Sequence, residues 1–221
     1  MVSLGSKTSS PGSETEGLDP RDESRMKRRS KAARKSRPLD ETTLRDLALS
    51  YVARFATTGA KLESYLARKV RERGVAEEAD GRTLQLDVTG LVTRLIELAY
   101  VDDEAYARSK SRDLTARGYG ARRVEQALWA AGVEEQVRSD TAPGEAESRR
   151  AAVLLAKKRR FGPFGDRPED EEREARHKRR EKQVAAMLRA GHLYEHAGFI
   201  VDAATQDDVE DWLLEIEDDA D

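Results

Sequence analysis

The side chains best suited to bind an anion surround a tight corner, Gly118-Tyr119-Gly120, near the middle of the chain. The basic residues on either side of it are Arg108, Lys110, Arg112, Arg117, Arg122 and Arg123. Arg122 and Arg123 fall in the first turn of an expected helix, where a cation opposes the helix dipole, so they suggest a role beyond folding. Free N–H groups at this helix start, flanked by two guanidinium groups, would bind a phosphate or a carboxylate. The alternative is a solvated basic face.

A second basic cluster precedes another corner of the chain. It comprises Lys157, Lys158, Arg159 and Arg160 and is followed by Phe161-Gly-Pro-Phe-Gly165. An aromatic pair beside cations can stack on nucleic-acid bases while the cations bind phosphates. We favour the simpler interpretation, in which Phe161 and Phe164 hold the corner against a core.

The first 37 residues have the composition of a disordered tail. Ser, Gly, Pro and Glu dominate the first twenty, and the segment 25–37 then holds eight basic residues and no acid. Such a segment binds nucleic acid electrostatically without reading its sequence. The alternative is a tail that only increases solubility.

The sequence offers little for catalysis or metal binding. It has no cysteine, which excludes disulfides and thiol catalysis. His192 and His196 are four residues apart, as two metal ligands on one helix face would be, but Glu195 faces elsewhere on the helix. With no glycine loop for phosphates, no catalytic carboxylate pair and no nucleophile beside a base, we predict no metal, no cofactor and no enzymatic activity. A hydrolase that uses both histidines is the alternative from that class.

Composition predicts an all-α protein with a thin core. The chain has 221 residues, of which 38% are hydrophobic, 38% charged and only 5% aromatic. No apolar run is long enough to span a membrane, and the first residues lack the apolar core of a signal peptide, so we expect a cytoplasmic protein and no membrane contact. The net charge of −3 conceals a basic beginning and an acidic end.

Helical periodicity predicts tandem units of three helices, which stack into an elongated, curved solenoid. Asp40 and Asp87 are placed to cap the first and third helices of the first unit. The stripes expected to face its core include Phe55 in the first helix and Leu98 in the third. The predicted segments are a tail (1–37), repeats at 38–100, 101–143 and 144–204, and an acidic amphipathic helix at 205–221.

The residues that begin and end helices are clearest in the middle repeat. Asp102 is placed to cap a helix beginning at Asp103, Gly118 ends that helix, and Gly120 and Gly132 begin and end the next one. Three further side chains of this repeat are expected to pack in the core or between repeats: Tyr106, Leu128 and Trp129.

The acidic end of the chain still carries an apolar stripe. Val209, Trp212, Leu213 and Ile216 keep helical spacing, although ten carboxylates and no Lys or Arg lie between positions 202 and 221. An amphipathic helix with a Trp anchor docks either in the groove of a partner or on its own chain. Docking on its own chain is the simpler hypothesis.

Several of these motifs together resemble the RecX family of recombination regulators. Tyr100-Val-Asp-Asp-Glu-Ala-Tyr-Ala107 is similar to the family's Gly-Tyr-Leu-Asp-Asp-(Glu)-x-(Phe/Tyr)-Ala signature, and Arg117-Gly-Tyr-Gly-x-Arg-Arg-Val124 follows it in order. Arg159-Arg160-x-Gly-Pro-Phe-Gly165 and Ala186-Met-Leu-Arg-Ala-Gly191 look like parts of the third repeat. The resemblance covers about residues 40–203, and the basic tail, the charged insertion after Gly165 and the acidic terminal helix depart from it.

The resemblance implies a non-enzymatic protein of tandem three-helix units that binds the RecA recombinase. Such a protein lies in the groove of the RecA filament on single-stranded DNA and limits filament growth, strand exchange and ATP hydrolysis. We expect a monomer. The residues expected to contact DNA or RecA are Arg108, Arg112, Arg117, Arg122, Arg123, Lys157, Lys158, Arg159 and Arg160. Those expected to shape the repeat are Asp102, Asp103, Tyr106, Gly118, Tyr119, Gly120 and Gly132. The alternative is a general nucleic-acid-binding helical protein that acts mainly through its N-terminal tail.

Overall fold

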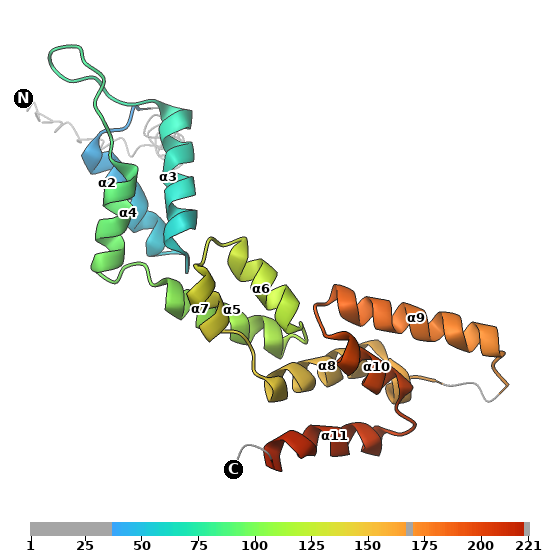
Figure 1. The fold of residues 1–221 in the computed structure, drawn as a ribbon. Helices are drawn as coiled ribbons and strands as arrows, with labels where there is room; N and C mark the ends of the chain where they lie inside the picture. The colour runs from blue at the N-terminus through green and yellow to red at the C-terminus, as the bar shows by residue number, and fades with distance from the viewer. Residues whose placement is uncertain (1–36, 167–169, 219–221) are drawn as a thin grey trace, which may run out of the picture.

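The structure is a computed structural model that describes residues 37–166 and 170–218 of the chain. Over these residues it is all helical, and successive groups of helices follow one another along an elongated, curved rod (Figure 1). The predicted fold class, an elongated all-α assembly of three-helix units, is confirmed. The predicted tail falls almost wholly outside the described residues.

The first unit consists of three helices that are each capped by a side chain. They are α2 (Glu41–Val52), α3 (Gly59–Arg73) and α4 (Val88–Glu97). As predicted, the side chains of Asp40 and Asp87 accept N–H bonds from the first turns of α2 and α4, and Thr58 does the same for α3. The core of this unit contains Leu39, Leu44, Ala48, Leu62, Leu66, Val92, Leu95 and Val101.

The second unit is smaller and has a core of its own. Its helices are α5 (Asp103–Ala116), α6 (Ala121–Trp129) and α7 (Glu135–Asp140). Gly118 and Gly132 both take positive φ, +89° and +74°, which ends α5 and α6 as predicted because glycine lacks the Cβ that disfavours this conformation. The buried residues here are Ala107, Leu114, Val124, Leu128, Ala131 and Val133.

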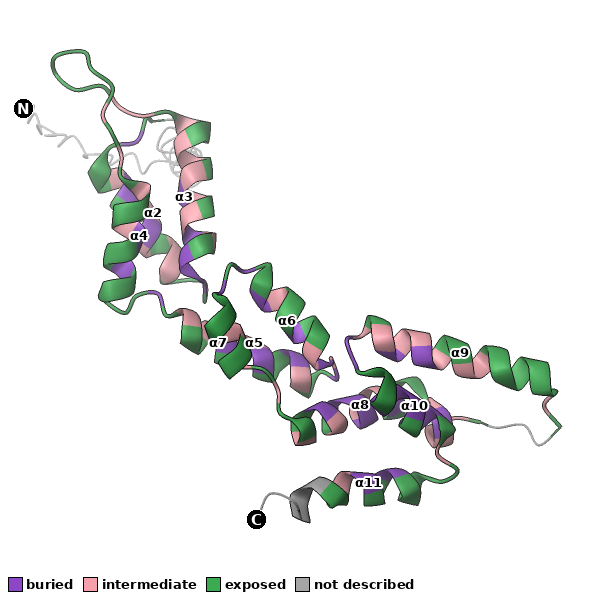
Figure 2. Ribbon diagram, viewed as in Figure 1, coloured by how far each residue is buried: buried purple, intermediate pink, exposed green. Residues whose placement is uncertain are grey.

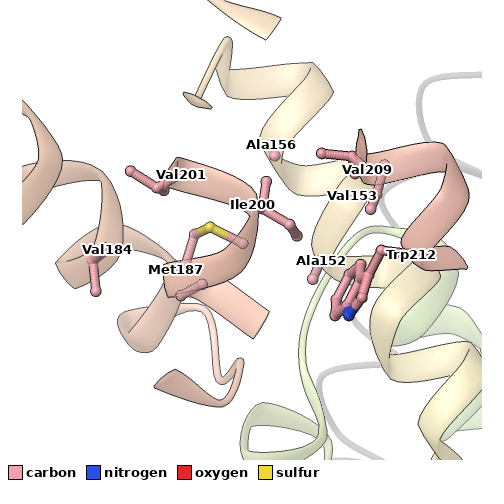
Figure 3. Close-up of a cluster of buried hydrophobic side chains, with 10 residues drawn as sticks. Ala152, Val153, Ala156, Val184, Met187, Ile200, Val201, Val209 and Trp212 are labelled. Carbon is pink, nitrogen blue, oxygen red and sulfur yellow. The ribbon is translucent and has the colours of Figure 1, made fainter. Parts of the chain in front are cut away.

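The third unit has an additional helix. It consists of α8 (Glu145–Arg159), the short 3-10 turn η1 (Gly162–Phe164), α9 (Arg173–Arg189), α10 (Tyr194–Asp202) and α11 (Gln206–Asp218). In Figure 3, Val209 and Trp212 of α11 face Ala152, Val153 and Ala156 of α8. The hypothesis that the acidic helix docks on its own chain is therefore confirmed.

The first and second units are joined by a small, specific contact. Thr58 Oγ1 donates to the carbonyl oxygen of Ala131 at 2.5 Å, and the N–H of Gly59 donates to the Asp103 carboxylate at 2.9 Å. Lys61 Nζ lies 2.6 Å from the Tyr106 hydroxyl. The start of α3 thus binds the start of α5 and the end of α6, which fixes the angle between the two units.

The second and third units meet through their backbones. The N–H groups of Gly120 and Arg122 donate to the carbonyl oxygens of Ala190 and Gly191, at 3.0 and 3.2 Å. A Cβ on Gly120 would lie 2.4 Å from the Gly191 carbonyl carbon, and a Cβ on Gly191 would lie 2.4 Å from the Arg123 nitrogen. Only glycine permits so close an approach of two chains.

Burial follows the predicted stripes in most places and departs from them at helix ends (Figure 2). Phe55 and Leu98 were expected to face the core but are about half exposed, because α2 ends at Val52 and α4 at Glu97. Trp129 is 70% exposed. Its predicted role in core or inter-repeat packing is wrong.

Candidate nucleic-acid interface

A basic groove of about 400 Å³ lies where the second and third units meet. It is lined by Arg117, Gly118, Tyr119, Leu155, Lys158, Arg159, Phe161, Ala186, Arg189 and Ala190. Four of these lining residues are cations and none is a carboxylate. The groove also has two aromatic rings in its wall, so its chemistry favours an anionic ligand that carries planar groups.

The groove is basic because three helices end there. Arg117 is the C-cap residue that follows α5. Lys158 and Arg159 lie in the last turn of α8, and Arg189 is the last residue of α9. The C-terminal end of a helix carries partial negative charge, which favours a cation in the last turn. Each of the four cations is therefore favourable at its own helix end. The docking of the two units brings them together in one groove.

Two of the groove cations are held by the protein itself. Arg117 lies 3.5 Å from an Asp113 carboxylate oxygen and its guanidinium group sits 5.8 Å from the centre of the Tyr119 ring. Lys158 Nζ donates to the Arg117 carbonyl oxygen at 3.2 Å. These contacts orient Arg117 and Lys158 across the junction between the units.

The other two groove cations, Arg159 and Arg189, are exposed and have no carboxylate partner among the described residues. Neither Arg159 nor Arg189 forms an ion pair with a carboxylate of the described residues. Their charges are therefore available to an incoming anion. Sequence reasoning selected Arg159 and missed Arg189. The signal was present, because Arg189 precedes Gly191 at the end of a helix much as Arg117 precedes Gly118 in the second unit.

The remaining predicted contact residues lie outside this groove. Arg108 pairs with Glu104 on α5 at 3.0 Å, and Arg112 lines a separate, shallow depression of about 330 Å³ with Glu147 and Arg150. Arg160 is the residue after α8 and takes the left-handed conformation, with φ of 55°. The structure thus spreads these cations over several faces.

Lys157 and Lys158 are neighbours in sequence but face different helices. Lys157 Nζ lies 3.6 Å from Glu210 of α11 and 5.4 Å from the centre of the Phe164 ring. Phe161 and Phe164 are partly buried against the core of the third unit, which agrees with the favoured interpretation of that corner. Lys157 therefore contributes to the attachment of α11, whereas Lys158 contributes to the groove.

Most N–H groups at the start of α6 are already bonded within the protein. The N–H groups of Gly120 and Arg122 are occupied by carbonyl oxygens of the third unit, and that of Arg123 donates to the Gly120 carbonyl oxygen at 2.9 Å. The prediction that these N–H groups are free for a phosphate or carboxylate is wrong for Gly120, Arg122 and Arg123. The guanidinium groups of Arg122 and Arg123 remain exposed at the surface.

The residues predicted to shape the repeat lie at its two ends. Asp102 caps α5 by accepting from the Ala105 N–H at 2.8 Å. Asp103 accepts from Gly59 across the first junction, and burial raises the pKa of its carboxyl group because the charged form loses water. A Cβ on Gly132 would lie 2.3 Å from the Ala60 Cβ, so this glycine also serves the junction.

The two histidines on α10 and just before it have separate structural partners. His192 Nε2 lies 3.1 Å from the Gly118 carbonyl oxygen, and His196 Nε2 lies 3.0 Å from the Glu145 carboxylate. Within the described part of the chain, no group of three or more His, Cys, Asp or Glu side chains is placed to hold a metal ion. His192 therefore connects the third unit to the end of α5, and His196 connects α10 to the start of α8.

Comparison with known proteins identifies the family of the chain. Residues 102–141 match the family described as RecX, second three-helix domain. The regulatory protein RecX of Myxococcus xanthus is 31% identical over 181 residues, which cover 80% of this chain and 94% of that protein. The chain belongs to the RecX family. The regulatory protein RecX of Agrobacterium fabrum is a second such relative, 31% identical over 76% of this chain and 86% of its own length.

A solved structure of a RecX protein confirms the fold. The crystal structure of RecX from Lactobacillus salivarius superposes with a TM-score of 0.52, covers 72% of this chain and 93% of its own, and is 19% identical in sequence. At this identity the likeness concerns the fold alone. None of the helices that the structure describes has the length and apolar character needed to cross a membrane.

Proposed function

We propose that this RecX-family protein limits the growth and activity of RecA filaments by binding them on single-stranded DNA. The basic groove between the second and third units contacts the phosphate backbone, and the rest of the rod lies along the filament. Occupation of that surface competes with the addition of the next recombinase subunit. The RecA partner rests on family membership, since relatives are described as regulatory proteins RecX.

The observation that supports nucleic-acid contact is the groove with four cations and no carboxylate in its wall. A chain with a formal net charge of −3 has no general attraction for DNA, so a local concentration of positive charge must supply it. Among the groove residues, Arg159 and Arg189 are the cations best able to release counterions from DNA, because no described carboxylate neutralises them.

Growing RecA filaments on single-stranded DNA provide the functional test. We expect sub-stoichiometric amounts of the protein to slow filament extension and the ATP hydrolysis that accompanies it. An unchanged time course of ATP hydrolysis at protein concentrations that saturate single-stranded DNA would contradict the proposed regulation of RecA.

The role of the groove is tested by the double variant Arg159→Gln/Arg189→Gln. We expect weaker binding to single-stranded DNA and a slope of log K against log salt that is smaller by about 1.4, since each lost phosphate contact on a single strand removes about 0.7. Arg45→Gln, which removes an exposed arginine from α2 far from the groove, is the matched control and should leave the slope unchanged. Equal slopes for all three proteins would show that the groove does not contact DNA.

A second candidate function is general nucleic-acid binding through the N-terminal tail, favoured by the eight basic residues in the segment 25–37. Deleting residues 1–37 separates the two. The shortened protein should still slow RecA-driven ATP hydrolysis if the repeats carry the function. Loss of both DNA binding and RecA regulation on deletion would favour the tail.

A further inference from the structure

Trp129 is the most exposed large apolar side chain of the described residues, with 70% of its surface open to solvent. The chain has two tryptophans, and the other, Trp212, is 8% exposed and packed in the core of the third unit. An exposed indole ring contributes nothing to the core, and its face can stack on a planar group of a ligand.

The position of Trp129 on α6 is opposite the core. Val124 and Leu128 are fully buried, and Arg122, Gln126 and Trp129 follow each other at spacings of four and three residues on the other side. The seven steps from Arg122 to Trp129 rise by about 10 Å along the helix. A cation, an amide and an aromatic ring thus form one outward stripe, which we call the α6 stripe.

Folding does not account for the cations of α6. Arg122 and Arg123 lie in the first turn, where they oppose the helix dipole, and neither forms an ion pair with a described carboxylate. The acid on this helix, Glu125, is bound to Arg138 at 2.6 Å and so cannot neutralise them. The α6 stripe therefore presents unpaired positive charge within one helix length of an exposed ring.

We propose that the α6 stripe binds single-stranded nucleic acid, with a base stacked on Trp129 and a phosphate bound by Arg122. An unpaired strand supplies anions and free aromatic faces in alternation, and the stripe offers a partner for each. A duplex would match it poorly, because its bases are stacked on one another. The α6 stripe begins two residues after the corner that lines the basic groove, so the same strand can contact both.

This inference deepens the proposed function and rests on its DNA contact, so the test measures binding and stacking separately. Binding of oligo(dT) is followed by the anisotropy of a dye on the oligonucleotide, and stacking by the intrinsic tryptophan emission of the full chain. Emission from Trp129 is the difference between the wild type and Trp129→Phe, in which Trp212 is the remaining indole. Long-chain polyphosphate, which carries charge but no bases, is the control ligand.

We expect oligo(dT) to quench the Trp129 emission in step with the anisotropy change, and polyphosphate to bind without quenching it. Trp212 emission, seen in Trp129→Phe, should stay constant. If the labelled oligonucleotide binds while Trp129 emission is unchanged, the stacking proposal is wrong and the proposed function stands. If no oligonucleotide binds, both the stacking and the DNA contact are wrong. A change of emission on adding RecA without DNA, with none on adding oligo(dT), would assign the stripe to a protein partner and overturn the proposal.

Affinity measurements give a second, independent readout. Trp129→Ala should weaken oligo(dT) binding roughly tenfold, as for loss of one stacked base, whereas Trp129→Phe, which retains a ring, should lose far less. Leu214→Ala removes another exposed apolar side chain, on α11, and should leave the affinity unchanged. Equal affinities for the wild type and Trp129→Ala would overturn the proposal.

Discussion

At the scale of single residues, His192 is a buried titratable group at the junction between the second and third units. It is 2% exposed, its Nε2 bonds to the Gly118 carbonyl oxygen, and its Nδ1 has no partner. Because a carbonyl accepts, Nε2 carries the proton in the neutral ring. Burial lowers the pKa of His192, the nearby His196 lowers it further, and the bond to Gly118 opposes both.

The lowered pKa of His192 predicts a loss of stability in acid. The unfolded chain takes up this proton near the ordinary value of about 6.5, whereas the folded chain resists it. The contribution to the free energy of unfolding is thus fully present above that pH and is lost as pH falls below it. Urea unfolding at several pH values should show that the free energy of unfolding falls more steeply with decreasing pH for the wild type than for His192→Asn. The control His177→Asn changes an exposed histidine and should show the same pH dependence as the wild type. Identical pH profiles for the wild type and both variants would show that His192 does not cause the loss of stability in acid.

Gly191 is predicted to be indispensable for the same junction. Gly191→Ala places a side chain at φ of +95° and a Cβ 2.4 Å from the Arg123 nitrogen, which should lower the free energy of unfolding by about 2–4 kcal/mol. Gly198→Ala is the matched control. It lies inside α10 with no atom within 4 Å of the added Cβ outside that helix's own backbone, so it should stabilise by about 0.5–1 kcal/mol. Thermal unfolding of both variants distinguishes the effect of the junction from that of any added methyl group.

Residue types predict local roles better than long-range ones. The caps Asp40, Asp87 and Asp102 could be found from the sequence because a short acidic side chain before a helix satisfies its own first turn. The role of Gly191 could not be found from the sequence, because it contacts backbone atoms. Backbone atoms are the same for every residue type and leave no pattern in the sequence. Trp129 was misassigned because periodicity identifies the buried stripe but gives no reason for a large apolar residue opposite it.

At the scale of secondary-structure elements, α11 is held on the third unit mainly by Trp212. The Arg149 guanidinium group lies 4.4 Å from the centre of its ring, and the Phe199 ring stacks on it at 4.7 Å. Arg149 also donates to the Trp212 carbonyl oxygen at 2.8 Å. The ion pair between Lys157 and Glu210 is largely exposed and contributes little by comparison.

This difference predicts unequal effects of two changes in α11. Trp212→Ala should lower the free energy of unfolding by about 3 kcal/mol or more, since it removes a buried aromatic side chain. Glu210→Gln should cost less than about 1 kcal/mol and lose even this effect at high salt. Denaturant midpoints at low and high salt measure both. A large, salt-sensitive loss for Glu210→Gln would show that charge, not the indole ring, holds the helix.

The amphipathic character of α11 was visible in the sequence, whereas docking on the chain itself was only the simpler of two hypotheses. The basic groove was visible only in part, because its cations come from three helix ends separated by up to 72 positions, from 117 to 189. Sequence neighbours were a poor guide there. Lys157 and Lys158 point to different elements because adjacent residues on a helix are 100° apart.

At the scale of the whole molecule, the described units follow one another in a row, and α5 of the second unit packs on α8 of the third. Each has its own core, and the contacts between units consist of a few hydrogen bonds, close glycine contacts and the packing of α5 on α8. Small-angle X-ray scattering of the chain without residues 1–36 should therefore give a radius of gyration well above about 16 Å, the value for a compact chain of that length. A value close to 16 Å would mean that the units fold back on one another in solution.

The extra helix also gives the rod a direction. In the described residues the first unit consists of three helices, whereas the last one carries α11 along α8 (Figure 1). The two ends are therefore unlike, with one smaller three-helix unit between them. A nucleic-acid strand has unlike ends as well, with a 5′ and a 3′ terminus. If a strand lies along the rod as proposed, its two orientations would meet different surfaces at the end that carries α11.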